Sequence, residues 1–259
     1  MDARPPDSTR RFSDRVDDYV RYRPSYPKAV LDLLRRECGL TPEWAVADIG
    51  SGPGNLARLF LDNGNRVLGI EPNREMRAAG ERLLGDFPRF ASVAGTAERT
   101  TLPDGDVDLV MAGQAFHWFD PDRARREFAR ILGFPAWVAL VWNERRVDST
   151  PFLAAYERLL LAHGTDYAAV RHQDVADANA LGRFFGAGGY ERAAFEHRQM
   201  FDFEGLRGRL LSSSYAPAAG QPGHDALLGG LRAAFEAYQE GGVVAFEYDT
   251  AVYYGRLGA

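Results

Sequence analysis

The sequence predicts a three-layer α/β fold built on a mostly parallel sheet. From Trp44 to Trp142, short apolar runs alternate with amphipathic helical patterns. The connections between them are short, as repeated β-α-β units with right-handed crossovers require. The length of 259 residues, with 46% hydrophobic and 26% charged residues, suits one large α/β domain. We therefore expect a single domain that contains a parallel sheet.

The elements of this alternating region follow from apolar runs and capping signals. Asn73 is placed to cap a helix that reaches Leu84, and Asp120 followed by Pro121 opens a helix that runs to Leu132. The expected strands are 44–49, 67–70, 90–94, 107–112 and 137–142. We assign residues 41–145 to a ligand-binding core.

The segments on either side of this core follow different patterns. In residues 1–40 a capping box at Ser13 starts a short helix that must end before Arg23-Pro24, and a second helix runs from near Pro27 to Gly39. Residues 146–259 carry the remaining strands with an inserted helical lid, as an antiparallel end of a seven-stranded sheet. The expected helices here are 151–163, 175–185, 206–211 and 227–238, and the strands are 194–203 and 246–254.

Bulk properties exclude several classes of function. The formal net charge is −5 and the pI about 5.6, whereas proteins that bind nucleic acid normally carry a basic excess. Cys38 is the single cysteine, so no intramolecular disulfide can form and a reducing compartment is favoured. The sequence has neither a signal-peptide pattern nor an apolar run of roughly 20 residues. We expect a cytoplasmic protein, monomeric or homodimeric, that does not contact membrane or nucleic acid.

The most informative stretch is the glycine loop Gly50-Ser51-Gly52-Pro53-Gly54, which follows Asp48 at the end of the first core strand. Ligands of open α/β sheets bind at this edge, and glycines let the backbone approach them closely. The dinucleotide fingerprint has a different spacing, G-x-G-x-x-G. A carboxylate at Asp48 would repel a pyrophosphate but suits a ligand that carries an ammonium group. S-adenosylmethionine has such a group and no phosphate.

A second acidic residue, Glu71, ends the next strand. It comes 71 − 50 = 21 positions after Gly50, close to the ~20 positions expected for a carboxylate that holds ribose hydroxyls. The alternative is a chance surface carboxylate, but the combination with Asp48 and the glycines favours a nucleoside site on a Rossmann-like sheet.

With these residues in view, the chain resembles the class I S-adenosylmethionine-dependent methyltransferases. More narrowly, it is similar to the small-molecule branch called methyltransferase type 11, which includes trans-aconitate-methyltransferase-like proteins. The resemblance spans nearly the whole chain. It is carried by Phe12…Tyr19…Tyr22–Pro27, Asp48–Gly54, Glu71–Asn73, Gly95–Glu98, Gln114–Phe119, Leu140–Arg145 and Glu247–Gly255. One departure is Gly133–Trp137, where the family commonly has a Pro-Gly-Gly turn.

The resemblance implies a set of residues that bind the donor S-adenosylmethionine and its product S-adenosylhomocysteine. Asp48 and the glycines would hold the methionine part, Glu71 the ribose, and the segment from Tyr19 to Arg23 would fold over the donor. The full implied set is Tyr19, Arg23, Asp48, Gly50, Ser51, Gly52, Gly54, Asn55, Glu71, Pro72, Met76, Thr96, Ala97, Glu98, Gln114, Ala115 and Phe116. The implied acceptor-binding residues are His117, Trp118, Trp142, Arg145 and Tyr215.

The chemistry needs few side chains, because methyl transfer is an in-line displacement in which positioning supplies roughly 7–11 kcal/mol of the barrier. His117 is the candidate general base if the acceptor must lose a proton, although a hydrogen-bonded pocket wall would explain it as well. Trp118 and Trp142 are equally explained by packing, and Arg145 by a solvated loop. The five histidines form no close pair, so we expect no metal site.

These observations favour methyl transfer to a small molecule, with a weak preference for a hydroxyl or carboxylate oxygen. Two alternatives remain open. One is a nicotinamide-dependent oxidoreductase, which the glycine spacing and Asp48 disfavour. The other is a catalytically silent subunit that binds S-adenosylmethionine, which the donor-binding residues do not exclude.

Overall fold

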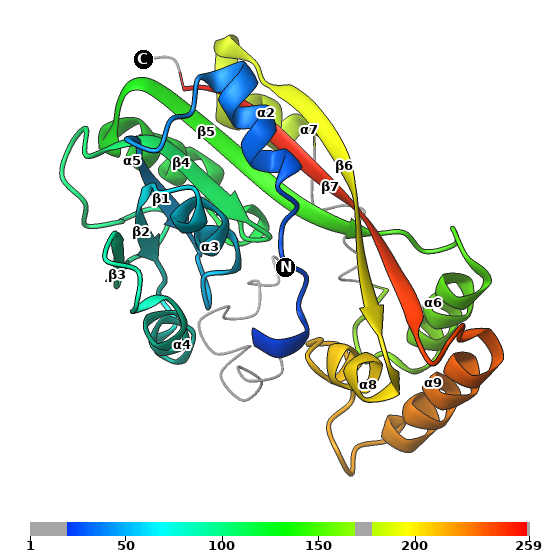
Figure 1. The fold of residues 1–259 in the computed structure, drawn as a ribbon. Helices are drawn as coiled ribbons and strands as arrows, with labels where there is room; N and C mark the ends of the chain where they lie inside the picture. Colours follow the sequence, from blue (N-terminus) through cyan, green and yellow to red (C-terminus); the bar gives the residue numbers. More distant parts are fainter. Residues whose placement is uncertain (1–19, 169–177, 258–259) are drawn as a thin grey trace, which may run out of the picture.

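The structure is a computed structural model that describes residues 20–168 and 178–257. Within these residues, seven strands form one sheet in the order β3-β2-β1-β4-β5-β7-β6. The pairs among β1 to β5 are parallel, and β7 runs antiparallel to β5 and to β6. This confirms the predicted α/β fold with an antiparallel end (Figure 1).

The parallel part follows the predicted alternation closely. Its strands are β1 (Ala45–Ile49), β2 (Arg66–Ile70), β3 (Phe90–Val93), β4 (Val107–Gly113) and β5 (Leu132–Arg145). Its helices are α2 (Ala29–Cys38), α3 (Asn55–Asp62), α4 (Arg74–Leu84) and α5 (Pro121–Ile131), with a short 3-10 helix η2 (Phe116–Trp118) after β4. Asn73 and Asp120 cap α4 and α5 by accepting hydrogen bonds from Met76 N–H and Arg123 N–H, at 2.9 and 3.0 Å.

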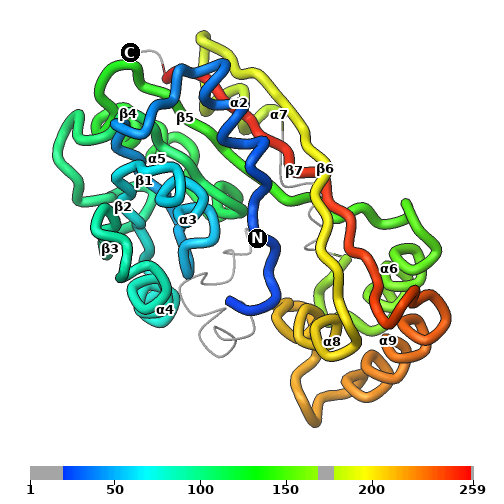
Figure 2. The backbone as a smooth tube through the Cα atoms, viewed as in Figure 1, coloured from blue at the N-terminus to red at the C-terminus, as the bar shows by residue number. Residues whose placement is uncertain are grey.

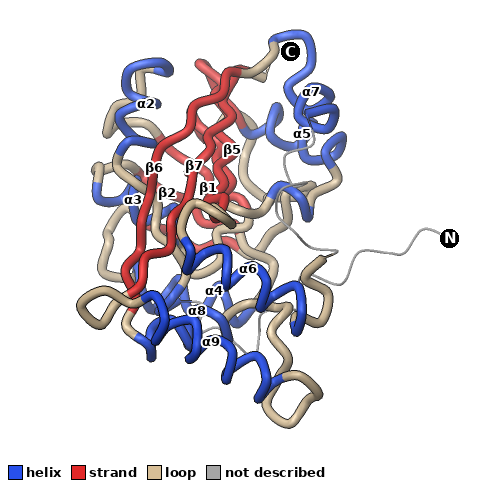
Figure 3. The backbone as a smooth tube through the Cα atoms, turned by 90° about the vertical axis from the view of Figure 1, so that its right-hand side faces the viewer, coloured by secondary structure: helices blue, strands red, loops and turns tan. Residues whose placement is uncertain are grey.

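Helices cover both faces of the sheet, as a three-layer sandwich requires. One face packs against α2 and α3, around side chains such as Leu34 and Phe60. The other packs against α5 and α7 (Ala178–Phe185), around Phe128 and Phe184. Figure 3 shows these helix pairs on opposite sides of the strands.

The second half of the chain builds a separate helical layer, which we call the cap. It consists of α6 (Pro151–His163), α8 (Phe203–Leu211) and α9 (His224–Tyr238), which share a core with the ends of β6 (Glu191–Phe201) and β7 (Val244–Arg256). Figure 1 shows the cap beyond these strand ends, where β5 also leads into α6. The strands therefore run from the sandwich into the cap without a break.

Two strands, β5 and β6, begin earlier than predicted. β5 begins at Leu132, directly after α5, because the stretch that departs from the usual turn continues the strand through a cis peptide bond at Phe134-Pro135. The strand predicted at 194–203 is β6 at Glu191–Phe201, since Asp202 caps α8 by accepting a hydrogen bond from Gly205 N–H. The capping box at Ser13 lies outside the described residues.

No helix within residues 20–168 and 178–257 has both the length and the apolar character that a bilayer crossing demands.

Candidate donor-binding site

The loop between β1 and α3 adopts backbone conformations that only glycine accepts readily. Gly50, Gly52 and Gly54 all have positive φ, at 69°, 54° and 91°. A Cβ on Gly50 would lie 2.7 Å from the Cβ of Ala115, so this glycine allows the loop to pass close to the end of β4. A Cβ on Gly52 would meet nothing within 4 Å. The loop therefore leaves open space beside Gly52, where a ligand can contact the backbone.

Glu71, directly after β2, holds this loop in place. Its Oε2 accepts a hydrogen bond from Gly52 N–H at 2.9 Å, and its Oε1 accepts one from Asn73 N–H at 2.8 Å. Burial raises the pKa of Glu71, and these two amides and Arg77 oppose the rise. An ionised carboxylate offers about four acceptor positions. Glu71 therefore keeps acceptor capacity for the hydroxyl pair of a ribose.

Asp48 is the least satisfied charged group of the site. It is only 1% exposed, and neither carboxylate oxygen has a hydrogen-bond partner among the described residues. Burial raises the pKa of Asp48 to about 7, and the negative charge of Glu71 adds to the rise. The backbone amide of Ala57 partly opposes this rise in the pKa. An unpaired buried carboxylate is costly, so its persistence indicates a cationic ligand group.

The carboxyl ends of β4 and β5 are tied together beside this loop. Asn143 N–H donates to Oε1 of Gln114 at 2.9 Å, and the Asn143 side-chain amide donates to the carbonyl of Ser25 at 3.0 Å. Thr250 donates to Oδ1 of Asn143 at 2.6 Å. Gln114 has φ of 55°, a conformation that concentrates at functional sites in residues other than glycine. These bonds fix the N-terminal segment over the edge of the sheet.

The structure brings most of the predicted donor-binding residues to this edge of the sheet. Ser51, Asn55 and Thr96 are half-buried or exposed, whereas Met76, Ala97, Ala115 and Phe116 are buried. Pro72 is exposed, and Glu98 accepts a hydrogen bond from Asp120 N–H at 2.9 Å. Tyr19 lies outside the described residues. The role of each in donor binding stays a prediction.

The predicted acceptor residues separate into different environments. His117 is exposed and lies on η2, with its ring centroid 4.8 Å from that of the half-buried Trp118. Trp142 is 2% exposed and packs edge-on against Phe116 and Tyr253 in the core. Packing therefore accounts for Trp142 in this structure, and its contact with an acceptor stays a prediction.

Arg145 and Tyr215 lie in a polar cluster between the end of β5 and the cap. Arg145 pairs with Glu157 at 2.5 Å and donates to the hydroxyl of Tyr167 at 2.8 Å. The Tyr167 ring lies edge-on to Tyr215, with centroids 4.8 Å apart. This arrangement contradicts the alternative that Arg145 is a solvated loop arginine.

The sequence interpretation missed Arg209, which belongs to the same cluster. It is 6% exposed on α8, where it donates to Ser213 Oγ at 3.0 Å and to the Tyr248 hydroxyl at 3.4 Å. A signal was present, because Leu206 and Leu210 define the buried stripe of the helix and Arg209 lies next to it at helical spacing.

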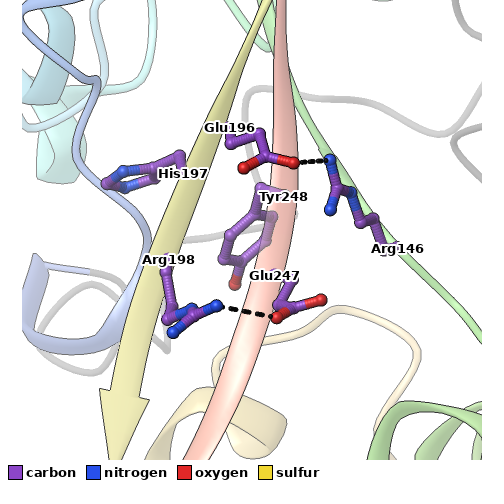
Figure 4. A pocket seen from close by; sticks show the side chains of 6 residues that line it. All are labelled: Arg146, Glu196, His197, Arg198, Glu247 and Tyr248. Carbon is purple, nitrogen blue, oxygen red and sulfur yellow. Dashed lines mark hydrogen bonds and ion pairs between the residues drawn. The ribbon is translucent and has the colours of Figure 1, made fainter. Parts of the chain in front are cut away.

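A second hollow lies on β6 and β7, away from the glycine loop. It has a volume of about 170 Å³ and is lined by Arg146, Glu196, His197, Arg198, Glu247 and Tyr248 (Figure 4). Arg146 pairs with Glu196 at 2.8 Å and Arg198 with Glu247 at 3.1 Å, so its charges compensate one another. We assign no ligand to it.

Together, the glycine loop, the two carboxylates and the strand order define a nucleoside-binding α/β domain. Residues 47–134 match the family model described as "Methyltransferase domain". Over this core, which includes the glycine loop, Asp48 and Glu71, the chain is similar to the methyltransferase domains that bind S-adenosylmethionine.

Relatives and solved structures show the same similarity. An uncharacterized methyltransferase of Mycobacterium tuberculosis is 37% identical over 139 residues, 54% of each chain, and one of Schizosaccharomyces pombe is 31% identical over 152 residues, 58% of this chain and 59% of that protein. These matches span little more than half the length of the curated relatives. The structure of a protein assigned as a type II methyltransferase from Anaeromyxobacter dehalogenans is 26% identical, with a TM-score of 0.70 over 91% of this chain and 98% of that one.

Proposed function

We propose that this protein transfers a methyl group from S-adenosylmethionine to an oxygen of a small-molecule acceptor, either a hydroxyl or a carboxylate. The observation that carries the proposal is Asp48, a buried carboxylate without a hydrogen-bond partner among the described residues, directly before the glycine loop. An α-ammonium group beside it would supply the missing positive charge and the missing hydrogen bonds. The net charge of −5 favours a small acceptor over nucleic acid.

The residues of the site fit this donor. Asp48 would hold the amino-acid part, the open space beside Gly52 would admit the ligand to the backbone, and Glu71 would accept the ribose hydroxyls. When bound, S-adenosylmethionine supplies a methyl group on a sulfonium sulfur, which keeps the electron pair of the broken C–S bond as the new C–O bond forms. The chain has to hold the acceptor oxygen in line and keep water away.

His117 is the candidate proton acceptor. It lies on η2, shortly after β4, and its imidazole is exposed. Three residues before it, Gln114 accepts the hydrogen bond that joins the ends of β4 and β5. A hydroxyl acceptor would pass its proton to this ring, whereas a carboxylate acceptor needs no base. For a hydroxyl acceptor we expect His117→Asn to lower kcat about 100-fold or more without changing the donor Kd.

Two measurements test the function. Isothermal titration calorimetry should show binding of S-adenosylmethionine or S-adenosylhomocysteine in the micromolar range, and no binding of NAD. Transfer of a tritiated methyl group to a panel of hydroxylated and carboxylated metabolites should follow. Binding of NAD alone would overturn the proposal, and donor binding without transfer to any fraction of a metabolite extract would identify a silent subunit instead.

A further inference from the structure

Arg209 is a buried cation for which the described residues supply no carboxylate. Both of its hydrogen bonds go to neutral hydroxyl groups, those of Ser213 and Tyr248, and its guanidinium also lies over the Phe246 ring, 5.9 Å from the centroid. The two bonds use Nε and Nη1, so Nη2 makes none within the described part of the chain. A buried charge without a counter-ion costs several kcal/mol. Such a group is retained most readily where a ligand provides the opposite charge.

Two further arginines, Arg145 and Arg23, lie close enough for their charges to act on the same tyrosine as Arg209, Tyr215. Arg145 shares its carboxylate partner, Glu157, with the Tyr167 hydroxyl, which donates to the same oxygen at 2.6 Å. Arg23 reaches the cluster from the N-terminal segment and donates to the carbonyl of Ser212 at 3.0 Å. Arg23 therefore brings a third guanidinium group to the side of the cluster.

Tyr215 reports the electrostatic potential at the centre of this cluster. Burial alone would raise the pKa of its phenol, but the charges of Arg209, Arg23 and Arg145 and a hydrogen bond from Ser213 lower the pKa below its usual value. When the pKa of a buried phenol is lowered, the positive charges around it more than offset the cost of its desolvation. The same potential would stabilise any anion that binds there.

The cluster lies within reach of the donor-binding edge. Asn143, which is bonded to Gln114 at the end of β4, comes two residues before Arg145 on β5. Two residues of strand span about 7 Å. The N-terminal segment joins the two places, because Ser25 is bonded to Asn143 and Arg23 to Ser212. Figure 2 shows this segment running from α2 to the side of α8.

We propose that the methyl acceptor carries a carboxylate, and that this carboxylate binds to Arg209 and Arg145 beside Tyr215 while the oxygen to be methylated faces the donor. This inference rests on the proposed function and names its substrate class. Two guanidinium groups with phenol hydroxyls beside them match the planar, two-oxygen geometry of a carboxylate. The anchored carboxylate takes part in no bond change.

The test measures binding of defined probes to the full chain, first saturated with S-adenosylhomocysteine. Calorimetry with acetate, benzoate, succinate and citrate should give millimolar or tighter binding for at least one of them. The corresponding neutral amides and inorganic phosphate should not bind. Binding of phosphate alone, or of no carboxylate, would overturn the proposal.

Variants then locate the bound group. Arg209→Gln should weaken carboxylate binding about 10- to 100-fold, the effect of losing a hydrogen bond to a charged group, and Arg209→Lys should restore part of it. Arg207→Gln is the matched control, because Arg207 lies on the same helix, is 47% exposed and pairs with Glu204. Tyr215→Phe, which removes only the hydroxyl, should weaken binding several-fold. Unchanged carboxylate affinity in both Arg209→Gln and Tyr215→Phe contradicts the site.

Failure of this inference and failure of the proposed function have different signatures. Normal affinity for S-adenosylhomocysteine without carboxylate binding removes the acceptor site alone. Carboxylate binding to the free protein without affinity for S-adenosylhomocysteine removes the donor site alone.

Discussion

The donor-binding edge and the cap cluster are both buried sites with unbalanced charge, but they are assembled in opposite ways. At the donor edge, Asp48 and Glu71 come from consecutive core strands, and the backbone amides of one short loop complete the site. In the cap, Arg145, Glu157 and Arg209 come from β5, α6 and α8, brought together only by tertiary packing. The first site is unbalanced by negative charge and the second by positive charge. The donor edge would suit a ligand with an ammonium group, and the cluster beside the cap would suit an anionic acceptor.

The largest effect should come from Asp48→Asn, which keeps the shape of the side chain and removes its charge. Loss of one member of a buried ion pair costs about 3–5 kcal/mol, so we expect affinity for S-adenosylhomocysteine to fall at least about 100-fold by calorimetry. Asp62→Asn is the control, because Asp62 lies on the exposed face of α3 and pairs with Arg58. Equal affinity of the Asp48 variant and the wild type would show that the donor edge does not use this charge.

The cap should respond most strongly at Arg145. Arg145→Gln removes the guanidinium group that pairs with the buried Glu157, and we expect the free energy of unfolding to fall by about 3 kcal/mol. The adjacent Arg146 makes surface pairs with Glu196 and Asp249, so Arg146→Gln should cost less than about 1 kcal/mol. Urea unfolding of both variants measures the contrast. Similar losses in the two variants would mean that the buried pair contributes no more than a surface one.

Protonation of Asp48 should make both stability and donor binding depend on pH. Its folded pKa of about 7 lies above the usual value of 3.8, so the folded protein binds the extra proton. The free energy of unfolding should therefore fall as pH rises from about 4 to 7, by up to about 4 kcal/mol, and stay lower above 7. Affinity for S-adenosylhomocysteine should weaken about tenfold per pH unit below 7, since binding needs the ionised form. Urea unfolding measures the free energy of unfolding across this pH range, and calorimetry measures the affinity, with Asp48→Asn as the reference. A difference between the two proteins that does not change with pH contradicts the raised pKa.

The smallest effects should come from alanine substitutions of Gly50 and Gly52, which should affect stability and donor binding differently. Alanine at either position meets the cost of a left-handed conformation, about 1–2 kcal/mol. Gly50→Ala also clashes with Ala115, so it should lower the melting temperature further, whereas Gly52→Ala fills open space and should mainly weaken donor binding. Thermal unfolding and calorimetry of the two variants distinguish these outcomes. The reverse pattern would place the ligand away from Gly52.

The same contrast explains what the sequence could predict. The mostly parallel sheet with its antiparallel end followed from local patterns, because consecutive β-α-β units leave few ways to arrange the strands. The glycine loop, Asp48 and Glu71 followed from the sequence at the ends of two of these strands. The caps at Asn73 and Asp120 were also predicted from local sequence, because Asn and Asp side chains accept hydrogen bonds from the free amides at the start of a helix. Arg209 and Glu157 were missed, since a charged residue on an amphipathic helix is normally at the surface and its burial depends on distant partners. The start of β5 was placed late because Gly133 and Pro135 are typical of a turn and here lie within a strand.

The continuity of the long strands has a mechanical consequence. β5 and β7, with 14 and 13 residues, each form part of the central sheet at one end and reach the cap at the other. Neither half can lose its order without withdrawing backbone hydrogen bonds from its neighbour. Melting of this protein should thus be a single cooperative event, and cutting the chain between the two halves should yield no fragment that folds alone.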